Sequence, residues 1–450
     1  MSVIYHDQAI DLGSDGSIVL AGAASLGYDQ AFQVVKYDST GEKLWGMSLR
    51  HTSDRHSVWD VDAAVAPSGD VYLVGTSWSD TSSWDIVTAR LTASGYHRWT
   101  RRYNGPGNSS DRGSALSLDS DGLPIVVGKT LNLERNHELV VLRYDTAGVL
   151  LWAHRYDPGS GNQSEGRAVA TTLSGRIYAA GKLQQQSAHA LVVGLGVGGD
   201  TCWARFHPGD GTAITVSDAG AVFVGGMAPD SSAIRTWAIS QFGELLWNQD
   251  WHRAGGTGEN TSALASGPAG ACYVLGRSTT TESGTDYVLV KYSATGAENW
   301  VAMYDGPSHA NDWPHALFVG LDGSAVVTGA SESEDGTTDF LTIRYPHSGP
   351  GIADGTVRCV TCSRIRVLPS VARSTCLLTG NACSDGYRFL ISDMSGRIVR
   401  RLSSNQPPSN CVQAVWELDD NLGHQVPNGV YCVTLDSPGH SACAKIIVQR

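Results

Sequence analysis

The ten residues Lys36-Tyr37-Asp38-Ser39-Thr40-Gly41-Glu42-Lys43-Leu44-Trp45 introduce a pattern that the chain repeats. A glycine stands four residues before a tryptophan at Gly41/Trp45, Gly95/Trp99, Gly148/Trp152, Gly199/Trp203, Gly243/Trp247 and Gly296/Trp300. Upstream, two glycines six residues apart frame an apolar run at Gly16/Gly22, Gly69/Gly75, Gly122/Gly128, Gly175/Gly181, Gly220/Gly226, Gly270/Gly276 and Gly323/Gly329. The first glycines of these pairs recur every 45 to 53 residues. A period of this length indicates an array of supersecondary units.

Each unit predicts a four-stranded antiparallel sheet with strands A to D. In the unit around Gly69, short β-branched and aromatic runs such as Val71-Tyr72-Leu73-Val74 alternate with turns rich in glycine, serine and aspartate. Such runs are typical of strands, and no stretch keeps the 3.6-residue apolar period of a helix. Four-stranded sheets repeated about an axis make a β-propeller. The seven repeats therefore predict an all-β, seven-bladed propeller over residues 1–351.

The repeated tryptophan on strand D is predicted to act as a large apolar wedge between neighbouring sheets. Burial of such a ring is worth roughly 3 kcal/mol, at about 25 cal/mol per Å². The predicted blade-core positions are Trp45, Trp99, Trp152, Trp203, Trp247 and Trp300.

The two ends of the repeat array are complementary. Residues 2–5 match the end of strand D in other units, with Met1 at the tryptophan position, whereas no tryptophan follows Gly349 or Gly351 in the seventh unit. Residues 2–5 are therefore expected to supply strand D of the last blade and to close the ring, which removes two open sheet edges. The N-terminus has no recognisable signal peptide, and a strand that starts at residue 1 suggests that a leader preceded it.

Charge and hydropathy exclude several classes of partner. The chain has 32 Lys plus Arg against 44 Asp plus Glu, and its net charge of -12 argues against nucleic acid or an anionic membrane as the main partner. No uninterrupted apolar segment reaches the length of about 18 residues that a membrane-spanning helix needs.

Cysteines mark a second domain at residues 352–450. Cys202 and Cys272 lie in the repeats, whereas the predicted disulfide pool crowds the tail at Cys359, Cys362, Cys376, Cys383, Cys411, Cys432 and Cys443. This density favours disulfides in an oxidising, extracellular compartment. A zinc site at Cys359 and Cys362 would need a second closely spaced pair of ligands, and the sequence offers none.

Long polar B–C and D–A connections should emerge on one face of the propeller, and such loops commonly carry recognition. The candidate binding residues on this face are Trp78, Trp84, Asp111, Glu259, Asp312 and Trp313. The tryptophans are expected either to stack on sugar rings or to pack locally against their own loops. The three acids are expected either to form a partial acidic ring at a channel mouth or to be solvated loop carboxylates.

The sequence predicts no catalytic residue and no cofactor or metal site. The 14 histidines lack metalloprotease spacing, and no nucleophile elbow or P-loop occurs. Ca²⁺ is the one ion left open. Asp119-Ser120-Asp121-Gly122 falls on a shared hairpin turn without the distal glutamate of an EF-hand, and Asp419-Asp420-Asn421 is the second candidate.

Strings such as Asp85-Ile86-Val87-Thr88-Ala89-Arg90 and Trp99-Thr100-Arg101-Arg102-Tyr103-Asn104-Gly105-Pro106 resemble the bacterial seven-bladed β-propeller repeat family of secreted and surface proteins. The resemblance covers residues 1–350 and implies architecture and an extracytoplasmic location, without a single shared activity. The stretch that ends at Trp45 is also similar to the docking repeats of quinoprotein dehydrogenases. Those enzymes usually have eight blades and a vicinal cysteine pair, whereas this chain has seven units and no adjacent cysteines.

The tail resembles the C-terminal sorting domains of the type IX secretion system and the related flagellar-hook-cap-like immunoglobulin modules. The matching pieces are Asp393-Met394-Ser395-Gly396-Arg397-Ile398-Val399, Trp416-Glu417-Leu418-Asp419-Asp420-Asn421, Pro427-Asn428-Gly429-Val430-Tyr431 and Lys445-Ile446-Ile447-Val448. The resemblance implies a small β-sandwich and partners in outer-membrane secretion and attachment. The cysteine load departs from the usual pattern and leaves a purely structural module open.

Together these features predict a secreted or cell-surface protein that is not an enzyme and that binds a glycan or a surface protein. The alternative is a structural subunit that assembles with copies of itself into a filament, sheath or surface layer. A quinoprotein-like propeller enzyme is the third possibility.

Overall fold

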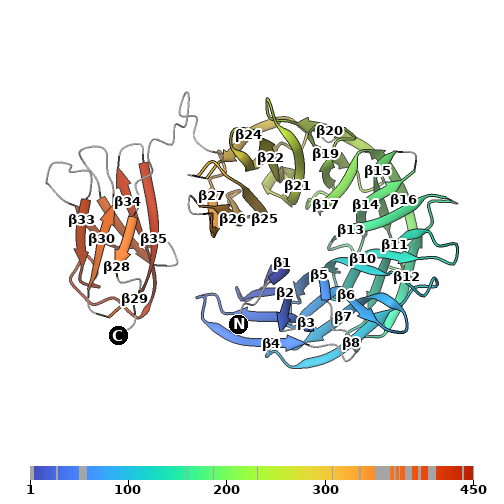
Figure 1. The fold of residues 1–450 in the computed structure, drawn as a ribbon, viewed down its shortest axis with the longest axis horizontal. Coiled ribbons are helices and arrows are strands. Elements are labelled where there is room, and N and C mark those ends of the chain that lie inside the picture. Colours follow the sequence, from blue (N-terminus) through green and yellow to red (C-terminus); the bar gives the residue numbers. More distant parts are fainter. Residues whose placement is uncertain are drawn as a thin grey trace. The chain divides into compact units, whose positions relative to one another are not determined.

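The computed structural model describes residues 5–448 except 27–28, 50–57, 160, 186, 231, 307, 334–335, 350–364, 369–370, 374, 381–387, 394–396, 404–411 and 438–439. The chain divides into two compact units, residues 1–352 and 353–450. The first unit is built from antiparallel sheets that follow one another in chain order (Figure 1). The all-β prediction is confirmed, because the only helix among the described residues is the single 3₁₀ turn η1 (Pro268–Gly270).

Six sheets of the first unit have four strands each. The first two contain β1 (Tyr5–Leu12), β2 (Ile18–Leu26), β3 (Asp29–Tyr37), β4 (Lys43–Leu49), then β5 (Val58–Val65), β6 (Val71–Ser79), β7 (Ser83–Leu91), β8 (His97–Tyr103). The third and fourth contain β9 (Arg112–Leu118), β10 (Pro124–Leu131), β11 (His137–Tyr144), β12 (Leu150–Tyr156), then β13 (Gln163–Thr171), β14 (Ile177–Gln184), β15 (Ala188–Leu195), β16 (Thr201–Pro208). The fifth and sixth contain β17 (Asp210–Val216), β18 (Val222–Met227), β19 (Ile234–Ile239), β20 (Leu245–Trp251), then β21 (Thr257–Ser266), β22 (Cys272–Thr280), β23 (Gly284–Tyr292), β24 (Glu298–Tyr304).

The seventh sheet has three described strands, β25 (Asp312–Val319), β26 (Ala325–Glu332) and β27 (Thr338–Tyr345). Residues 2–4, from which the sequence predicts its fourth strand, lie outside the described residues. The sequence also places Tyr5 in the last blade, and this is wrong, because Tyr5 opens β1 and pairs with Ala24 in the first sheet. Closure of the ring by the N-terminus, and with it the count of seven blades, stays a prediction.

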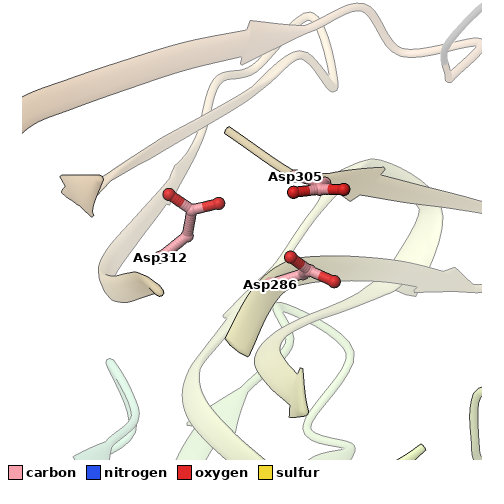
Figure 2. Close-up of side chains that lie close together, drawn as sticks. All are labelled: Asp286, Asp305 and Asp312. Carbon is pink, nitrogen blue, oxygen red and sulfur yellow. The ribbon is translucent and has the colours of Figure 1, made fainter. Parts of the chain in front are cut away.

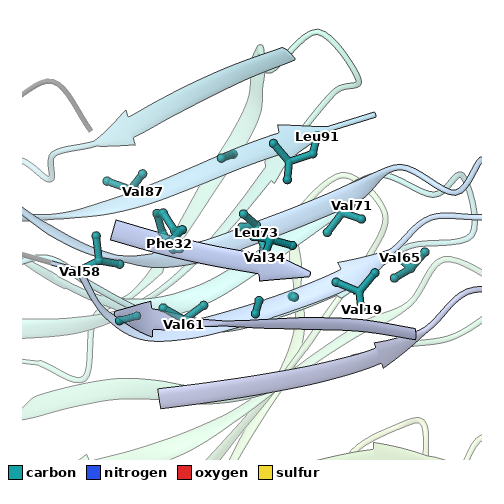
Figure 3. Packing of buried hydrophobic residues seen from close by; sticks show 14 residues of the cluster. Val19, Phe32, Val34, Val58, Val61, Val65, Val71, Leu73, Val87 and Leu91 are labelled. Carbon is teal, nitrogen blue, oxygen red and sulfur yellow. The ribbon is translucent and has the colours of Figure 1, made fainter. Parts of the chain in front are cut away.

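Apolar side chains fill the space between each sheet and the next. The cluster between the first two sheets contains Phe32 and Val34 of β3 and Val58, Val71 and Val87 of β5, β6 and β7, each at most 2 % exposed (Figure 3). Five further clusters join the remaining sheets in the same way. In the five sheets that have a described neighbour on each side, strands B and C are therefore covered on both faces, which explains why they form continuous apolar runs rather than alternating ones. In the seventh sheet, by contrast, the residues of β26 alternate in burial.

Each repeated tryptophan contacts the following sheet at its C–D turn. The indole Nε1–H of Trp99 donates to the carbonyl of Thr146 at 2.9 Å, and a Cβ added at Gly148 would lie 2.7 Å from the Trp99 ring. Gly148 has a φ of +79°, so this position needs glycine both for its conformation and for the close approach of the ring. The same bond joins Trp45 to Ala93, Trp152 to Val197, Trp203 to Gln241, Trp247 to Ala294 and Trp300 to His347.

The second unit consists of two sheets around one core. One sheet contains β28 (Ile365–Leu368), β30 (Cys376–Gly380) and β33 (Val412–Trp416), and the other β29 (Val371–Ala372), β31 (Arg388–Asp393), β32 (Ile398–Ser403), β34 (Gly429–Ser437) and β35 (His440–Val448). Trp416 is fully buried in this core and donates its Nε1–H to the carbonyl of Asp419 at 2.8 Å. Two sheets that share a core make a sandwich, and its immunoglobulin-like character stays a prediction.

The described part of the tail leaves the disulfide pairing open. Cys359, Cys362, Cys383 and Cys411 lie outside the described residues, as does the side chain of Cys443. Cys376 is 1 % exposed in the sandwich core, where burial raises the pKa of its thiol to about 11. Among the described residues it has no disulfide partner.

Candidate functional site

Three tryptophans of the second sheet lie together at the end of the sheet from which the B–C and D–A connections leave. Trp78 is the last but one residue of β6 and Trp84 the second residue of β7, and their rings meet edge to face with centroids 5.3 Å apart. Trp59 of β5 packs against Trp84 in the same geometry at 6.5 Å. Trp59 is 43 % exposed, so this aromatic patch (Trp59, Trp78 and Trp84) presents an indole ring to solvent.

A β-bulge positions the exposed ring. The register of β5 against β6 shifts between Trp59 and Asp62, and Asp60 within this shift has a φ of +54°. A bulge adds a residue to one strand and redirects the side chains around it, and a positive φ in a residue other than glycine is strained and is stabilised by its surroundings. The Asp60 carboxylate meets the guanidinium of Arg112, with Arg112 Nη2 2.5 Å from Asp60 Oδ1. This charge-assisted pair fixes the bulge.

A polar hollow of about 200 Å³ lies between the third and fourth sheets, at the ends of strands β10, β11, β13 and β14. Its walls carry Lys129, His137, Gln163, Ser164, Glu165, Lys182 and Gln184. Lys129 pairs with Glu165 at 3.2 Å, while burial and the Lys129 charge lower the pKa of His137. The hollow thus offers both hydrogen-bond donors and acceptors.

The three acids predicted on the binding face are buried, with 0 % of Asp111 and Glu259 and 1 % of Asp312 exposed. They are therefore neither an exposed acidic ring nor solvated loop carboxylates, which corrects the expectation from the sequence. Asp111 instead holds its own loop: its carboxylate accepts the N–H groups of Gly105 at 2.5 Å and Leu131 at 3.0 Å. Trp78, Trp84 and Trp313 are each half-buried.

The two Ca²⁺ candidates of the sequence are turns held by protein donors. Asp119 Oδ1 accepts the N–H groups of Asp121 and Leu123, and Arg143 pairs with Asp119 at 2.6 Å. Asp420 Oδ1 accepts two N–H groups of the following turn. A third group, absent from the sequence prediction, comprises Asp286, Asp305 and Asp312, each of which offers one oxygen within 4.8 Å of the others (Figure 2).

Sequence reasoning missed Trp59, Asp286 and Asp305. Trp59 lies beside a bulge that recurs in the A–B pairing of the other sheets of the first unit, so the repeat carried a signal for its position. The positions of Asp286 and Asp305 could have been identified from the repeat. Asp286, Asp305 and Asp312 have the same spacing as Asp85, Asn104 and Asp111 in the second unit. Alignment of the repeats would have placed them at equivalent positions.

No protein-family model and no curated protein matches the chain. Solved structures similar to it include the type IX secretion component PorZ of Porphyromonas gingivalis, with 15 % identity and a TM-score of 0.43. The similarity covers 99 % of this chain and 59 % of PorZ, so the chain spans less than two thirds of that protein. Quinohemoprotein alcohol dehydrogenase ADHIIG from Pseudomonas putida HK5 shares 12 % identity at a TM-score of 0.48, over 85 % of this chain and 70 % of that chain.

An α-L-arabinanase from Penicillium chrysogenum shares 11 % identity at a TM-score of 0.40, over 67 % of this chain and 93 % of that chain. Similarities at this level concern the fold alone and assign no activity to this chain. The sequence predicts that the chain is not an enzyme. This prediction is wrong, because the similar structures include enzymes. Among the described residues, no helix has the length and apolar character to cross a bilayer.

Proposed function

We propose that the chain is an extracellular or cell-surface protein whose first unit, a closed seven-bladed propeller, binds a glycan through the aromatic patch of the second sheet. The observation that carries this proposal is the exposed Trp59 ring, held edge to face against Trp84 on a rigid strand. A flat aromatic face supplies apolar contact area at a small cost in conformational entropy. Sugar rings present apolar C–H faces that match such a surface.

Polar groups around the patch supply the orientation that stacking alone lacks. The Asp60–Arg112 pair lies at the base of Trp59 and offers charged hydrogen-bonding groups, with the Arg112 side chain 51 % exposed. The polar hollow lined by Lys129 and Glu165 opens at the same ends of the next pair of sheets. Small-ligand sites commonly combine an apolar surface with a few fixed polar groups. An oligosaccharide that runs along this face would meet both features.

The second unit serves export and attachment in this proposal. Its support is the sequence resemblance to type IX sorting domains and the sandwich core around Trp416. The cysteine-rich tail supports an oxidising location. Binding of a surface protein through the same aromatic face is the alternative partner, and assembly with further copies of the chain is the alternative function.

The test is a binding screen of the full chain on immobilised polysaccharides, followed by calorimetry with oligosaccharides of the best binder. Trp59→Ala removes the exposed ring and should weaken binding at least about tenfold, since loss of an aromatic anchor costs on the order of 2 kcal/mol. Trp59 is exposed, so the variant should fold.

Tyr96→Ala is the matched control, because Tyr96 is 73 % exposed in a C–D turn on the opposite face. It should leave the affinity unchanged. Equal loss in both variants, or no saturable glycan binding by the wild type, would refute the proposal. Particles that grow into regular polymers in light scattering without glycan would favour the assembly alternative instead.

A further inference from the structure

Asp286, Asp305 and Asp312 come from two neighbouring sheets. Asp286 is the third residue of β23, Asp305 follows the end of β24, and Asp312 opens β25 in the next sheet. Asp286 and Asp305 are 19 residues apart and Asp305 and Asp312 are 7 apart. In Figure 2 the three carboxylates lie close together, and one oxygen of each lies within 4.8 Å of the others.

The equivalent positions elsewhere in the array carry less charge. The same spacing gives Asp85, Asn104 and Asp111 in the second repeat, and Glu138, Asp157 and Ser164 in the third. Only the junction of the sixth and seventh sheets combines three acids among these three sets. Repeat geometry therefore brings the positions together, and the local sequence makes this copy acidic.

One oxygen of each carboxylate is held by a protein donor. Asp286 Oδ2 accepts the Ser283 hydroxyl at 2.6 Å and pairs with Arg253. His309 Nδ1 lies 2.7 Å from Asp305 Oδ2, and the N–H of Gly306 donates to Asp312 Oδ2 at 2.7 Å. Such bonds orient carboxylates toward a shared point, as the supporting bonds around metal ligands do.

The remaining oxygens include two that are buried without a partner. Asp286 Oδ1 and Asp305 Oδ1 receive no hydrogen bond in the described part of the chain, and the Asp286 side chain is 0 % exposed. Burial of an ionised oxygen without a donor or counter-charge is unfavourable. In Figure 2 the carboxylates of Asp286 and Asp305 lie close together, so a single cation bound between them would offset the charge of both.

The excess of negative charge among these three carboxylates also favours a bound cation. Among the described residues, Arg253 pairs with Asp286, and His309 pairs with Asp305 when its imidazole is protonated. In the second sheet Arg102 pairs with Asp85, Asn104 is neutral, and Asp111 is satisfied by Thr130, Gly105 and Leu131. Repulsion within the cluster is thus only partly offset by the protein.

We propose that Asp286, Asp305 and Asp312 bind one divalent cation at the junction of the sixth and seventh sheets, with Ca²⁺ preferred over Mg²⁺. Ca²⁺ takes six to eight oxygen ligands at about 2.3–2.6 Å, so two of its ligands lie up to about 5 Å apart. Each pair of oxygens in the cluster, within 4.8 Å of each other, fits this limit. Mg²⁺, with ligands at about 2.0–2.1 Å in near-ideal octahedral geometry, sets a stricter limit on the same oxygens.

The test is calorimetric titration of the full chain, first freed of metal with a chelator, with CaCl₂ and separately with MgCl₂. One saturable Ca²⁺ site with a Kd on the order of 10⁻⁴–10⁻³ M is expected, as in extracellular modules with few charged ligands. Ca²⁺ should also raise the thermal midpoint of the wild type.

Asp305→Asn copies the residue found at the equivalent position of the second repeat and should weaken Ca²⁺ binding at least about tenfold. Asp157→Asn makes the same change at the equivalent position of the third repeat and should leave the affinity unchanged. Circular dichroism checks that both variants fold. Equal affinity in Asp305→Asn and the wild type, no saturable binding up to 10 mM as a rough upper limit for such modules, or Mg²⁺ binding as tight as Ca²⁺ binding would each overturn the assignment.

Discussion

Replacement of Gly148 by alanine places a methyl group against the indole of Trp99 in the preceding sheet. The new Cβ would lie 2.7 Å from Cδ2 of the ring. The ring has little room to move, because it is 6 % exposed, packs against Tyr72 and Tyr144, and its Nε1–H bonds to Thr146. The substitution therefore tests whether the repeated tryptophan acts as a wedge fitted to the following turn.

Two costs add in this variant. The φ of +79° at Gly148 costs a residue with a Cβ about 1–2 kcal/mol, and overpacking against a fixed ring costs about 1–3 kcal/mol. Gly122→Ala separates them, since Gly122 lies in the A–B turn of the same sheet with a φ of +73°. Its added Cβ would meet only Pro67, at an ordinary 3.5 Å. Gly148→Ala should thus be about 1–3 kcal/mol less stable than Gly122→Ala.

Urea denaturation followed by tryptophan fluorescence measures this difference, because every tryptophan except Trp416 lies in the first unit. The unfolding midpoint of Gly148→Ala should fall well below that of Gly122→Ala at an unchanged slope m. Equal midpoints would refute the proposed packing of Trp99 against this turn, because both variants would then lose stability only through the backbone conformation.

Two further predictions follow from burial. Burial raises the pKa of Asp62 to about 6, even though the Leu116 N–H donates to its carboxylate. Between about pH 4 and 6 the folded state therefore binds more protons than the unfolded state. As pH rises through that window, ionisation of Asp62 lowers the free energy of unfolding by about 3 kcal/mol. Asp62→Asn should remove this slope from unfolding free energies measured at pH 4 and pH 7, and an unchanged slope would contradict the shift. Cys202 is exposed whereas Cys272 and Cys376 are buried, and burial raises the pKa of both buried thiols. In a native titration with a thiol-specific disulfide reagent, Cys202 should react before Cys272 and Cys376. Peptide mapping that finds either buried thiol modified as fast as Cys202 would contradict this order.

The repeat pattern predicted the positions of strands well because strand order within a sheet depends on short-range features. Glycine at a turn and an apolar run beside it lie within about ten residues of each other, and antiparallel neighbours joined by tight turns need no distant information. The candidate site was predicted less well. Trp78 and Trp84 were found because they occupy a recognisable B–C connection, whereas Trp59 depends on a bulge with a strained Asp60.

The sequence by itself determined the all-β class, the repeat of sheet-forming units and the fixed offset between glycine and tryptophan, because these properties repeat along the chain. Tertiary structure decided which side chains are buried and which meet across sheets. Asp111, Glu259 and Asp312 occupy equivalent repeat positions and are all buried, yet within the described part of the chain only Asp312 belongs to a group of three acids whose oxygens lie close together. The reason is physical: a carboxylate's surroundings depend on the packing of the adjacent sheet, where the partners of Asp312 are 7 and 26 residues away in the sequence.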